Sequence, residues 1–419
     1  MTDISSVAVI GLGYIGLPTA AILAGHGLRV HGVDVNQVTV DAVNAGTVPF
    51  VEPDLDRYVG RAVSEGLLTA STDTPVADAY IVAVPTPFHE DKSPDLSYIE
   101  AAGRSLAPQL RGSELVILES TSPPGATERM AAVIHEVRPD LAEAGTLLFA
   151  HCPERVLPGK VMTELVTNDR IVGGSSRAAA EAAKGLYETF CQGEILLTNL
   201  RTAEMAKLVE NSFRDVNIAF ANELSMICQE LDIDVWELIE LANHHPRVNV
   251  LQPGPGVGGH CIAVDPWFIV DAAPDAARII RSAREINDSK PQWVIDQVKA
   301  KAFDVQQATG RAPVVAALGL AFKPNIDDLR ESPALNITAS MARQFTGSTI
   351  LAVEPHVAEL PAVLTGMDHV ELVSPEAAIE RADIIVLLVD HSAFAGLKSL
   401  ATGKHLVDTR GQWREQRVL

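Results

Sequence analysis

The stretch VAVIGLGYIGLPTAAILAGHGLRVHGVDVN, residues 7–36, constrains the fold of this chain more than any other. Gly11, Gly13 and Gly16 follow an apolar run in GxGxxG spacing and open a helical pattern, and a second apolar run ends at Asp34. This order predicts a strand, a tight glycine turn, a helix and a second strand. The glycines let a pyrophosphate approach the positive end of the helix. We predict a dinucleotide-binding loop made of Gly11, Gly13, Tyr14, Ile15 and Gly16.

Asp34 indicates which dinucleotide binds. A carboxylate at the end of the second strand accepts hydrogen bonds from the adenosine ribose and repels a 2′-phosphate, which favours NAD over NADP. The alternative is a glycine turn in an α/β protein that binds no cofactor. Two later strand ends, VPTP and ESTSPPG, place Thr86 and Thr121 where such a sheet meets its ligand, although each is also an ordinary turn residue.

The secondary-structure pattern of the sequence changes twice along the chain. Short apolar runs alternate with helical stretches over the first 200 residues, which predicts a parallel sheet covered on both faces. A long stretch from Thr202 to Leu231 is helical in pattern, and a second begins near Asp275, with Pro291 expected to open its last helix. Strand patterns return after Pro313. We expect an α/β fold with an N-terminal Rossmann domain (1–198), a central all-helical domain (199–305) and a C-terminal Rossmann-like domain (306–419).

Charge and cysteine content exclude several classes of protein. A net charge of −21 disfavours nucleic acid and anionic membranes as partners. The four cysteines form no CxxC pair, so we expect neither a metal site nor a disulfide scaffold. The apolar runs are too short to span a bilayer, and the N-terminal one begins a strand rather than a signal peptide. A reducing cytoplasm is the expected location.

Cys261 ends the glycine-rich stretch GPGVGGHC, and Asp265 follows it by four residues. Glycine removes side chains, which suggests that a reactant has to come close to the sulfur. A cysteine thiolate in a dehydrogenase adds to an aldehyde and gives a thiohemiacetal, which loses a hydride to become a thioester. The alternative is a buried structural thiol.

Three further residues have side chains suited to such a site. Lys207 and Asn211 lie four residues apart in a helical pattern and so share one face. Lys207 is suited to stabilise an oxyanion and relay a proton, and Asn211 to hold a water or hydroxyl. Glu154, in HCPERVLPGK, is suited to activate water as a base. The alternatives are a solvated lysine and a surface acid.

Taken together, these motifs resemble the UDP-glucose/GDP-mannose dehydrogenase family in order and over nearly the whole chain. They are GLGYIG, VPTP, ESTSPPG, PERVLPG, AEMAKLVENSFRD, GVGGHCIAVDPW and GLAFKPNIDDLRESP. The resemblance implies oxidation of the C6 alcohol of a nucleotide sugar to a carboxylate with two NAD⁺. It implies that Cys261 is the nucleophile, Lys207 the proton donor and oxyanion partner, and Glu154 the catalytic glutamate. Asn211 and Asp265 match the positions that order water and brace the site.

The resemblance also implies binding residues. Phe322, Lys323, Arg410 and Gly258 match substrate positions, Arg330 a position near the cofactor, and Arg247 an arginine that family dimers donate across the subunit interface. A homodimer through the central helices is therefore expected. Thr39 departs from the family, which often has Arg or Lys near the adenosine end of the cofactor.

Within the family, the chain resembles the branch that acts on UDP-N-acetylhexosamines. His260 precedes the cysteine, IAVDPW follows it, and Pro158 replaces a second glutamate. The substrate implied is UDP-N-acetyl-D-mannosamine, oxidised to the uronate for surface polysaccharide synthesis, with UDP-N-acetyl-D-glucosamine or UDP-glucose as alternatives. The sugar contacts implied by this resemblance are Arg155, Val156, Arg214 and His245.

Overall fold

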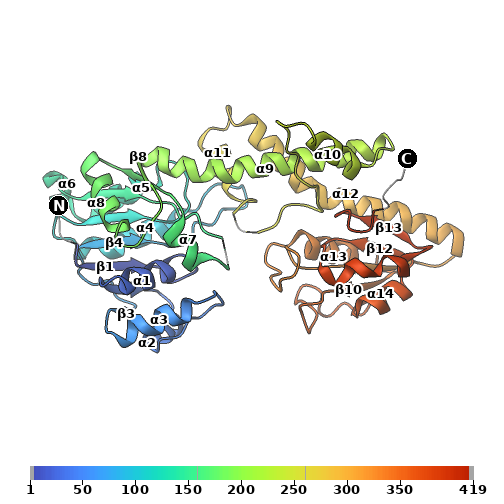
Figure 1. Ribbon diagram of the computed structural model, residues 1–419, viewed down its shortest axis with the longest axis horizontal. Helices are drawn as coiled ribbons and strands as arrows, with labels where there is room; N and C mark the ends of the chain where they lie inside the picture. Colours follow the sequence, from blue (N-terminus) through green and yellow to red (C-terminus); the bar gives the residue numbers. More distant parts are fainter. Residues whose placement is uncertain (1–3, 158, 260, 415–419) are drawn as a thin grey trace. The chain divides into compact units, whose positions relative to one another are not determined.

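The structure, a computed structural model, describes residues 4–157, 159–259 and 261–414. It divides into two compact units, one of residues 1–210 and 271–274 and the other of residues 211–270 and 275–419. Figure 1 shows a sheet-based fold in each unit. Within the described residues, no helix is both long and apolar enough to cross a membrane.

The first unit is built on one eight-stranded sheet with the strand order β3-β2-β1-β4-β5-β6-β7-β8. All neighbouring pairs are parallel except β6 with β7. The strands are β1 (Ser6–Ile10), β2 (Arg29–Val33), β3 (Leu68–Ser71), β4 (Ala79–Val82), β5 (Leu115–Leu118), β6 (Leu148–His151), β7 (Arg170–Gly174) and β8 (Ile195–Asn199). Because β1, β4 and β5 are parallel neighbours, the loops that follow them lie at one edge of the sheet.

Helices cover both faces of this sheet, as predicted. One buried cluster includes residues of α1 (Gly16–Gly25), α2 (Gln37–Asn44), α3 (Leu55–Ser64), α7 (Val161–Thr167) and α8 (Arg177–Tyr187). The cluster on the opposite face includes α4 (Ser97–Leu106), α5 (Ala126–Val137) and α6 (Pro139–Ala144). Strands β1, β4 and β5 contribute alternate residues to the two clusters, as the pleat of a doubly covered sheet requires.

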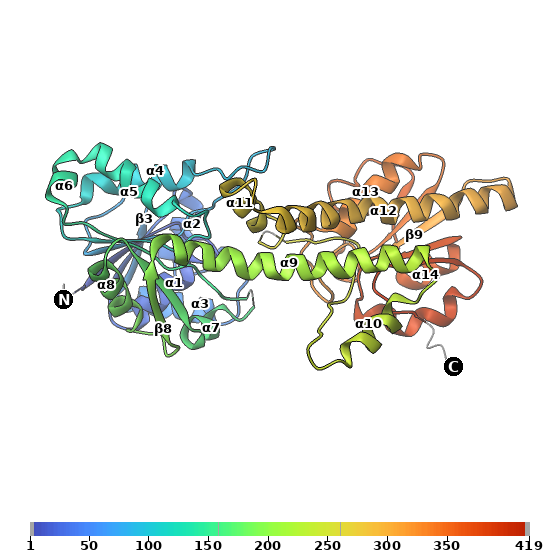
Figure 2. The ribbon, with the colours of Figure 1, turned by 90° about the horizontal axis from the view of Figure 1, so that it is seen from above.

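The helical region consists of α9 (Leu200–Glu230), α10 (Val235–Asn243), α11 (Asp265–Ala272) and α12 (Arg278–Thr309). Within the second unit, α9 and α12 run side by side in both views (Figures 1 and 2). Buried polar pairs join them: Arg284 Nη1 donates to Asp215 Oδ1 at 2.6 Å, and Asn222 Nδ2 donates to Asn287 Oδ1 at 2.8 Å. These bonds fix the register of the two helices, since each buried polar group needs its partner.

The expectation that Pro291 opens a helix is wrong. Pro291 lies inside α12, a helix of 32 residues that continues past the proline to Thr309. Proline has no N–H to donate to the carbonyl four residues earlier, which ordinarily favours a helix start. Packing compensates, because Arg284, Asn287 and Lys290 on the preceding turns are all buried. Tertiary packing here outweighs a local preference.

A second parallel sheet with the order β11-β10-β9-β12-β13 forms the C-terminal part of the second unit. Its strands are β9 (Val314–Leu318), β10 (Thr349–Val353), β11 (Val370–Leu372), β12 (Ile384–Leu387) and β13 (His405–Asp408). Residues of α12 and α13 (Pro333–Gln344) pack on one face, and residues of α14 (Pro375–Arg381) and the 3₁₀ helix η2 (Ser392–Ala401) pack on the other. All five strands lie in the C-terminal region where the sequence predicts a return of strand patterns. The α/β, helical, α/β organisation is confirmed.

Candidate active site

The glycine turn after β1 has the geometry that a dinucleotide site needs. Gly11 has φ +94°, and a Cβ there would lie 2.5 Å from the Ala83 carbonyl oxygen. A Cβ on Gly16 would lie 1.9 Å from the Gly11 oxygen. At Gly13, in contrast, a Cβ would meet nothing within 4 Å, and the residue is exposed. Two glycines are thus required by the fold, and the middle one leaves open space beside the start of α1.

Asp34 closes the turn from the end of β2. Its Oδ2 accepts from Leu12 N at 2.9 Å and its Oδ1 from Asn36 N at 2.9 Å. The carboxylate stays half-buried, and Thr39 follows on α2, also half-buried. Tyr14 is 41% exposed, and its ring lies 4.2 Å from that of Phe50. The half-buried Ile15 precedes α1.

The two threonines occupy neighbouring loops at the same edge of the sheet. Thr86 follows β4 and Thr121 follows β5, and both are half-buried. Ser120 Oγ ties these loops together by donating to Val84 O at 2.6 Å. The Oγ atoms of Thr86 and Ser122 are buried without a hydrogen-bond partner among the described residues. Unsatisfied buried hydroxyls are rare, and these two are suited to a polar ligand.

Glu154 is buried rather than on the surface. It follows β6 with 8% exposure, and its Oε2 lies 3.2 Å from Arg170 Nη2 on β7. Arg170 is also buried, and its Nη1 lies 3.9 Å from Glu119 Oε1 at the end of β5. Thr19 and Tyr187 donate to the two oxygens of Glu119. Two carboxyl groups therefore share one arginine inside the domain.

This arrangement sets the charges of the cluster. Burial, followed by the charge of Glu154, raises the pKa of Glu119 to about 8, while Arg170 opposes the shift. At neutral pH Glu119 therefore keeps its proton. Glu154 faces the Arg170 guanidinium, and the carboxyl group of Glu119 on the other side of that arginine is neutral.

Arg155 and Lys207 lie on the same unit as Glu154. Arg155 forms an ion pair with Glu210 of α9 at 2.7 Å and donates to Asp169 O at 3.0 Å. Val156 is half-buried against the core, and Lys207 is half-buried on α9. The Arg155–Glu210 pair fixes the segment after β6 to the helix that carries Lys207.

In the second unit, the cysteine loop leads into helix α11. Cys261 is exposed, and its carbonyl accepts from Asp265 N at 2.9 Å, which forms the turn before the helix. The carboxylate of Asp265 is 4% exposed and accepts from Asn211 Nδ2 at 2.5 Å. The structure therefore brings two of the predicted residues, Asn211 and Asp265, directly together.

Two of the glycines before the cysteine, Gly256 and Gly258, lie in close contact with other parts of the chain. A Cβ on Gly258 would lie 2.7 Å from Pro333 Cδ, 2.8 Å from Glu331 O and 3.2 Å from Phe322 Cβ. A Cβ on Gly256 would lie 3.1 Å from both Pro291 and Pro333. At these two positions Pro291 of α12 and the segment from Phe322 to Pro333 fill the space, so packing within the chain is enough to require glycine. Gly259 has φ +86° and lies against the Phe322 ring.

The predicted nucleotide contacts surround this loop. Phe322 is half-buried, Lys323 is exposed with its Nζ 5.3 Å from the Phe322 ring centre, and Arg330 pairs with Asp328 at 2.6 Å. Arg410 follows β13, forms an ion pair with Asp390 at 2.8 Å, and lines a cavity of about 590 Å³. The other lining residues are Trp236, Glu240, Asn243, His244, Gln252, Gly411 and Arg414.

The remaining predicted contacts are on the surface of the second unit. His245 and Arg247 are exposed in the segment after α10, and Arg214 is exposed on α9. Their side chains are accessible to a ligand or to another subunit.

Comparison with known proteins identifies the family. Its NAD-binding domain matches residues 5–191, its central domain residues 201–289 and its UDP-binding domain residues 316–415. The chain belongs to the UDP-glucose/GDP-mannose dehydrogenase family. The chain is therefore an NAD-dependent nucleotide-sugar dehydrogenase, as the sequence predicted.

The relatives of this nucleotide-sugar dehydrogenase cover its whole length. The chain is 57% identical to an NDP-N-acetyl-D-galactosaminuronic acid dehydrogenase from Ralstonia nicotianae, covering 99% of this chain and 98% of the relative. It is 56% identical to a UDP-N-acetyl-D-mannosamine dehydrogenase from Salmonella typhi, covering 98% and 99%. A solved UDP-D-ManNAc dehydrogenase from Pyrococcus horikoshii superposes with a TM-score of 0.85 at 38% identity, covering 99% and 97%.

The N-terminal domain of this dehydrogenase fits NAD. The open space at Gly13, the start of α1 and the Asp34 carboxylate match the pyrophosphate and ribose ends of the cofactor. The partnerless hydroxyls of Thr86 and Ser122 lie after strands adjacent to the glycine turn. When bound, NAD⁺ supplies a hydride acceptor.

Sequence reasoning missed the residues that control Glu154. Arg170 and Glu119 come from strands β7 and the end of β5, and their contact depends on sheet order, which no local motif reports. Ser122 carried a signal, since it stands in the same ESTSPPG motif as Thr121. His260 and Pro158, which pointed to the N-acetylhexosamine branch, lie outside the described residues.

Proposed function

We propose that this enzyme oxidises the C6 alcohol of UDP-N-acetyl-D-mannosamine to UDP-N-acetyl-D-mannosaminuronate. The observation that carries the proposal is the full-length similarity to dehydrogenases of N-acetylhexosamine nucleotides, combined with an exposed Cys261 beside the Asn211–Asp265 pair. The balance is one alcohol, two NAD⁺ and one water giving one carboxylate, two NADH and three protons.

The first oxidation needs a group that manages the hydroxyl proton. Lys207 takes this role: it relays the proton of the C6 hydroxyl as the hydride leaves, and its ammonium stabilises the developing oxyanion. The Cys261 thiolate then adds to the C6 aldehyde and gives a thiohemiacetal. Loss of the second hydride converts this adduct to a thioester.

Hydrolysis of the thioester needs an activated water. Glu154, which forms an ion pair with Arg170, removes a proton from that water, and the attack releases the carboxylate and regenerates the thiolate of Cys261. Asn211 and Asp265 order the water and brace the site. Asn211 donates to Asp265 from Nδ2, which leaves its Oδ1 as the acceptor for this water.

The remaining predicted residues bind the substrate and the cofactor. We assign the UDP end to Gly258, Phe322, Lys323 and Arg410, and the diphosphate also to Arg247 from a second subunit. The sugar is contacted by Arg155, Val156, Arg214 and His245, and the cofactor by the glycine loop, Asp34, Thr86, Thr121 and Arg330. Locally gathered cations of this kind allow a protein with a net charge of −21 to bind a diphosphate.

A second candidate substrate is the corresponding N-acetylgalactosamine nucleotide. The relative from Ralstonia nicotianae, named for N-acetylgalactosaminuronic acid, favours it. The galacto sugar differs from the manno sugar at C2 and C4, whereas the gluco sugar differs at C2 alone. The contacts near C2 and C4 therefore decide among the three.

A panel of UDP sugars tests the proposal. Purified enzyme is assayed with the UDP derivatives of N-acetylmannosamine, N-acetylglucosamine, N-acetylgalactosamine and glucose, and NADH is counted per sugar consumed. The highest kcat/KM on the manno substrate with two NADH supports the proposal, and a preference for the galacto substrate favours the second candidate. Cys261→Ser should release no uronate. If this variant still gives two NADH per sugar, the thioester route is wrong.

We also propose a homodimer formed through the central helices. Phe213, Phe220 and Ile227 recur every seven residues on α9 and are 71%, 52% and 44% exposed, which leaves an apolar stripe along one helix face. Light scattering after gel filtration should give a dimer for the wild type and a monomer for Phe220→Asp. We retain the domain boundaries 1–198, 199–305 and 306–419 as part of this proposal.

A further inference from the structure

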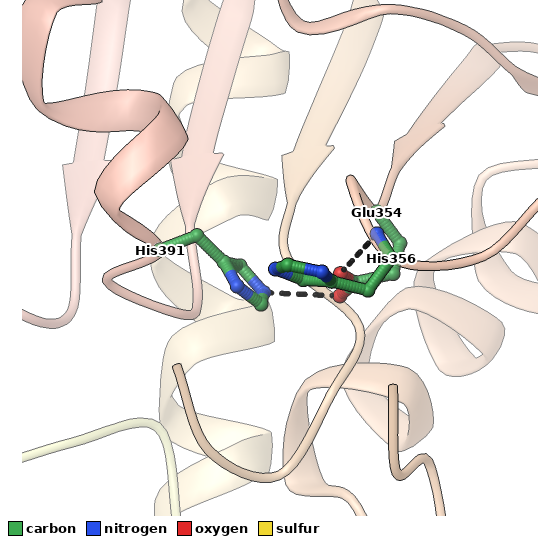
Figure 3. A group of neighbouring side chains, drawn as sticks. All are labelled: Glu354, His356 and His391. Atoms are coloured by element: carbon green, nitrogen blue, oxygen red, sulfur yellow. Dashed lines mark hydrogen bonds and ion pairs between the residues drawn. The ribbon is translucent and has the colours of Figure 1, made fainter. Parts of the chain in front are cut away.

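Glu354, His356 and His391 form a cluster at the carboxyl ends of β10 and β12 (Figure 3). Glu354 follows β10 and His391 lies beyond β12, and both are buried, whereas His356 is exposed. The carboxylate oxygen and the ring nitrogens lie within 4.8 Å of one another. Residue types and spacing of this kind suit a divalent metal, so the hydrogen bonds of each group decide what the cluster does.

Both ring nitrogens of His391 are engaged by the protein. The main-chain N–H of Asn325 donates to Nδ1 at 2.9 Å, so Nδ1 carries no proton. The other nitrogen, Nε2, then carries the proton and donates to Glu354 Oε2 at 3.0 Å. The same oxygen accepts from the main-chain N–H groups of Leu320 and Ala321 at 2.8 and 3.0 Å. Metal binding would break these bonds, so the pattern favours a structural role. We call the hydrogen-bonded pair of Glu354 and His391 the clamp.

The clamp holds both ends of one short loop. Glu354 binds the amides of Leu320 and Ala321, and His391 binds the amide of Asn325. Asn325 has φ +62°, a conformation that costs a non-glycine residue energy, and Ser392 stabilises it by donating from N and Oγ to the Asn325 side chain. The residues between the two ends, 322–324, carry the phenyl ring and the ammonium group assigned above to UDP.

The N-terminal domain contains the same turn without the clamp. Gly11 N donates to Val33 O and Gly319 N to Val353 O, each at 2.8 Å, and both glycines have φ near +90° (94° and 92°). The strand orders β3-β2-β1-β4-β5 and β11-β10-β9-β12-β13 correspond. Glu354 is thus the counterpart of Asp34. Asp34 is half-buried, whereas Glu354 is 5% exposed beneath His391.

We propose that Glu354 and His391 are positioning residues that hold the 320–325 loop ready for the UDP moiety. By engaging the acid that a Rossmann domain offers to a ribose, they also exclude dinucleotide binding of the N-terminal kind from the C-terminal domain. The assignment of UDP to this loop rests on the proposed function. The hydrogen bonds of the clamp are independent of that function. Because the loop is already ordered before UDP binds, binding loses less conformational entropy and is therefore tighter.

UDP alone tests the proposal by calorimetry, with NAD⁺ titrated separately. His391→Ala should weaken UDP binding roughly tenfold, since two loop residues lose their fixed conformation. The NAD⁺ affinity of the N-terminal site, in the other unit, should stay unchanged. His391→Gln, which offers both an acceptor and a donor, should restore part of the affinity and covers the case in which the alanine variant fails to fold. His356→Ala is the matched control and should bind UDP like the wild type.

Hydrogen exchange gives a readout that needs no ligand. The amides of Leu320, Ala321 and Asn325 should exchange at least tenfold faster in His391→Ala than in the wild type or in His356→Ala. Unchanged exchange and unchanged UDP affinity in His391→Ala would overturn the proposal. So would stoichiometric Zn²⁺ binding that both histidine variants abolish. If the wild type binds no UDP, the proposed function fails, and the clamp is then decided by exchange alone.

Discussion

Replacing Glu119 by glutamine should change how the stability of the NAD-binding domain depends on pH. The pKa of Glu119 rises from its ordinary value of 4.5 to about 8 because the group is buried and faces Glu154. Between these values the folded state holds a proton that the unfolded state has released, so raising the pH destabilises the wild type. The slope for one proton is about 1.4 kcal/mol per pH unit. Glu119→Gln does not titrate and lacks this slope.

From pH 5.5 to 7.5 the variant should therefore gain about 3 kcal/mol relative to the wild type. Hydrogen exchange of the β5 amides measures the opening free energy of this sheet. Comparing the two proteins at each pH cancels the intrinsic exchange rates. Strand β9, in the other unit, reports any change common to the whole chain. If the difference between the proteins stays constant within about 0.5 kcal/mol, Glu119 is ionised at neutral pH and the protonation state assigned to it is wrong.

Three further predictions concern the cofactor loop and the helix pair. Gly16→Ala places a Cβ 1.9 Å from a main-chain oxygen of the same turn and should abolish NAD⁺ binding in calorimetry. Gly13→Ala meets no neighbouring atom, so its melting temperature should stay within a few degrees of the wild-type value, and yet it should bind NAD⁺ at least tenfold more weakly. Asp34→Asn keeps a hydrogen-bond acceptor but loses the charge, and the ratio of NAD⁺ to NADP⁺ activity should fall about tenfold. Arg284→Met leaves Asp215 buried without its cation and should cost about 3–5 kcal/mol in urea unfolding followed by tryptophan fluorescence; a loss below 1 kcal/mol would contradict this ion-pair reasoning.

Strands with continuous apolar runs were predictable, and weaker ones were not. Strands β1, β4, β5 and β6 of the first sheet and β9, β10 and β12 of the second are largely apolar and lie where apolar runs alternate with helical patterns in the sequence. Strands β3 (LTAS), β7 (RIVGG) and β8 (ILLTN) mix polar and small residues, and only pairing within the sheet makes them strands. The prediction for Pro291 was wrong for a related reason. The packing of its buried neighbours stabilises a helix that proline by itself disfavours.

Some parts of the candidate site were predictable from the sequence, and others were not. Local motifs were enough to find the glycine turn, Asp34 and the cysteine loop, because each acts through residues close in sequence. The burial of Glu154, its arginine on β7 and the protonation of Glu119 depend on which strands are neighbours. The packing of Gly258 against Pro333 joins residues 75 positions apart, and no spacing rule reports it.

That packing has a consequence for redesign of the enzyme. The cysteine loop and the loop that precedes α13 meet where Gly258 has no side chain, so any larger residue there must displace one of them. A substitution at residue 258 would therefore disturb both the cysteine loop and the loop that we propose to bind UDP. Libraries that seek a new sugar should leave this glycine fixed and vary exposed positions that we propose to contact the sugar, such as Arg214 and His245.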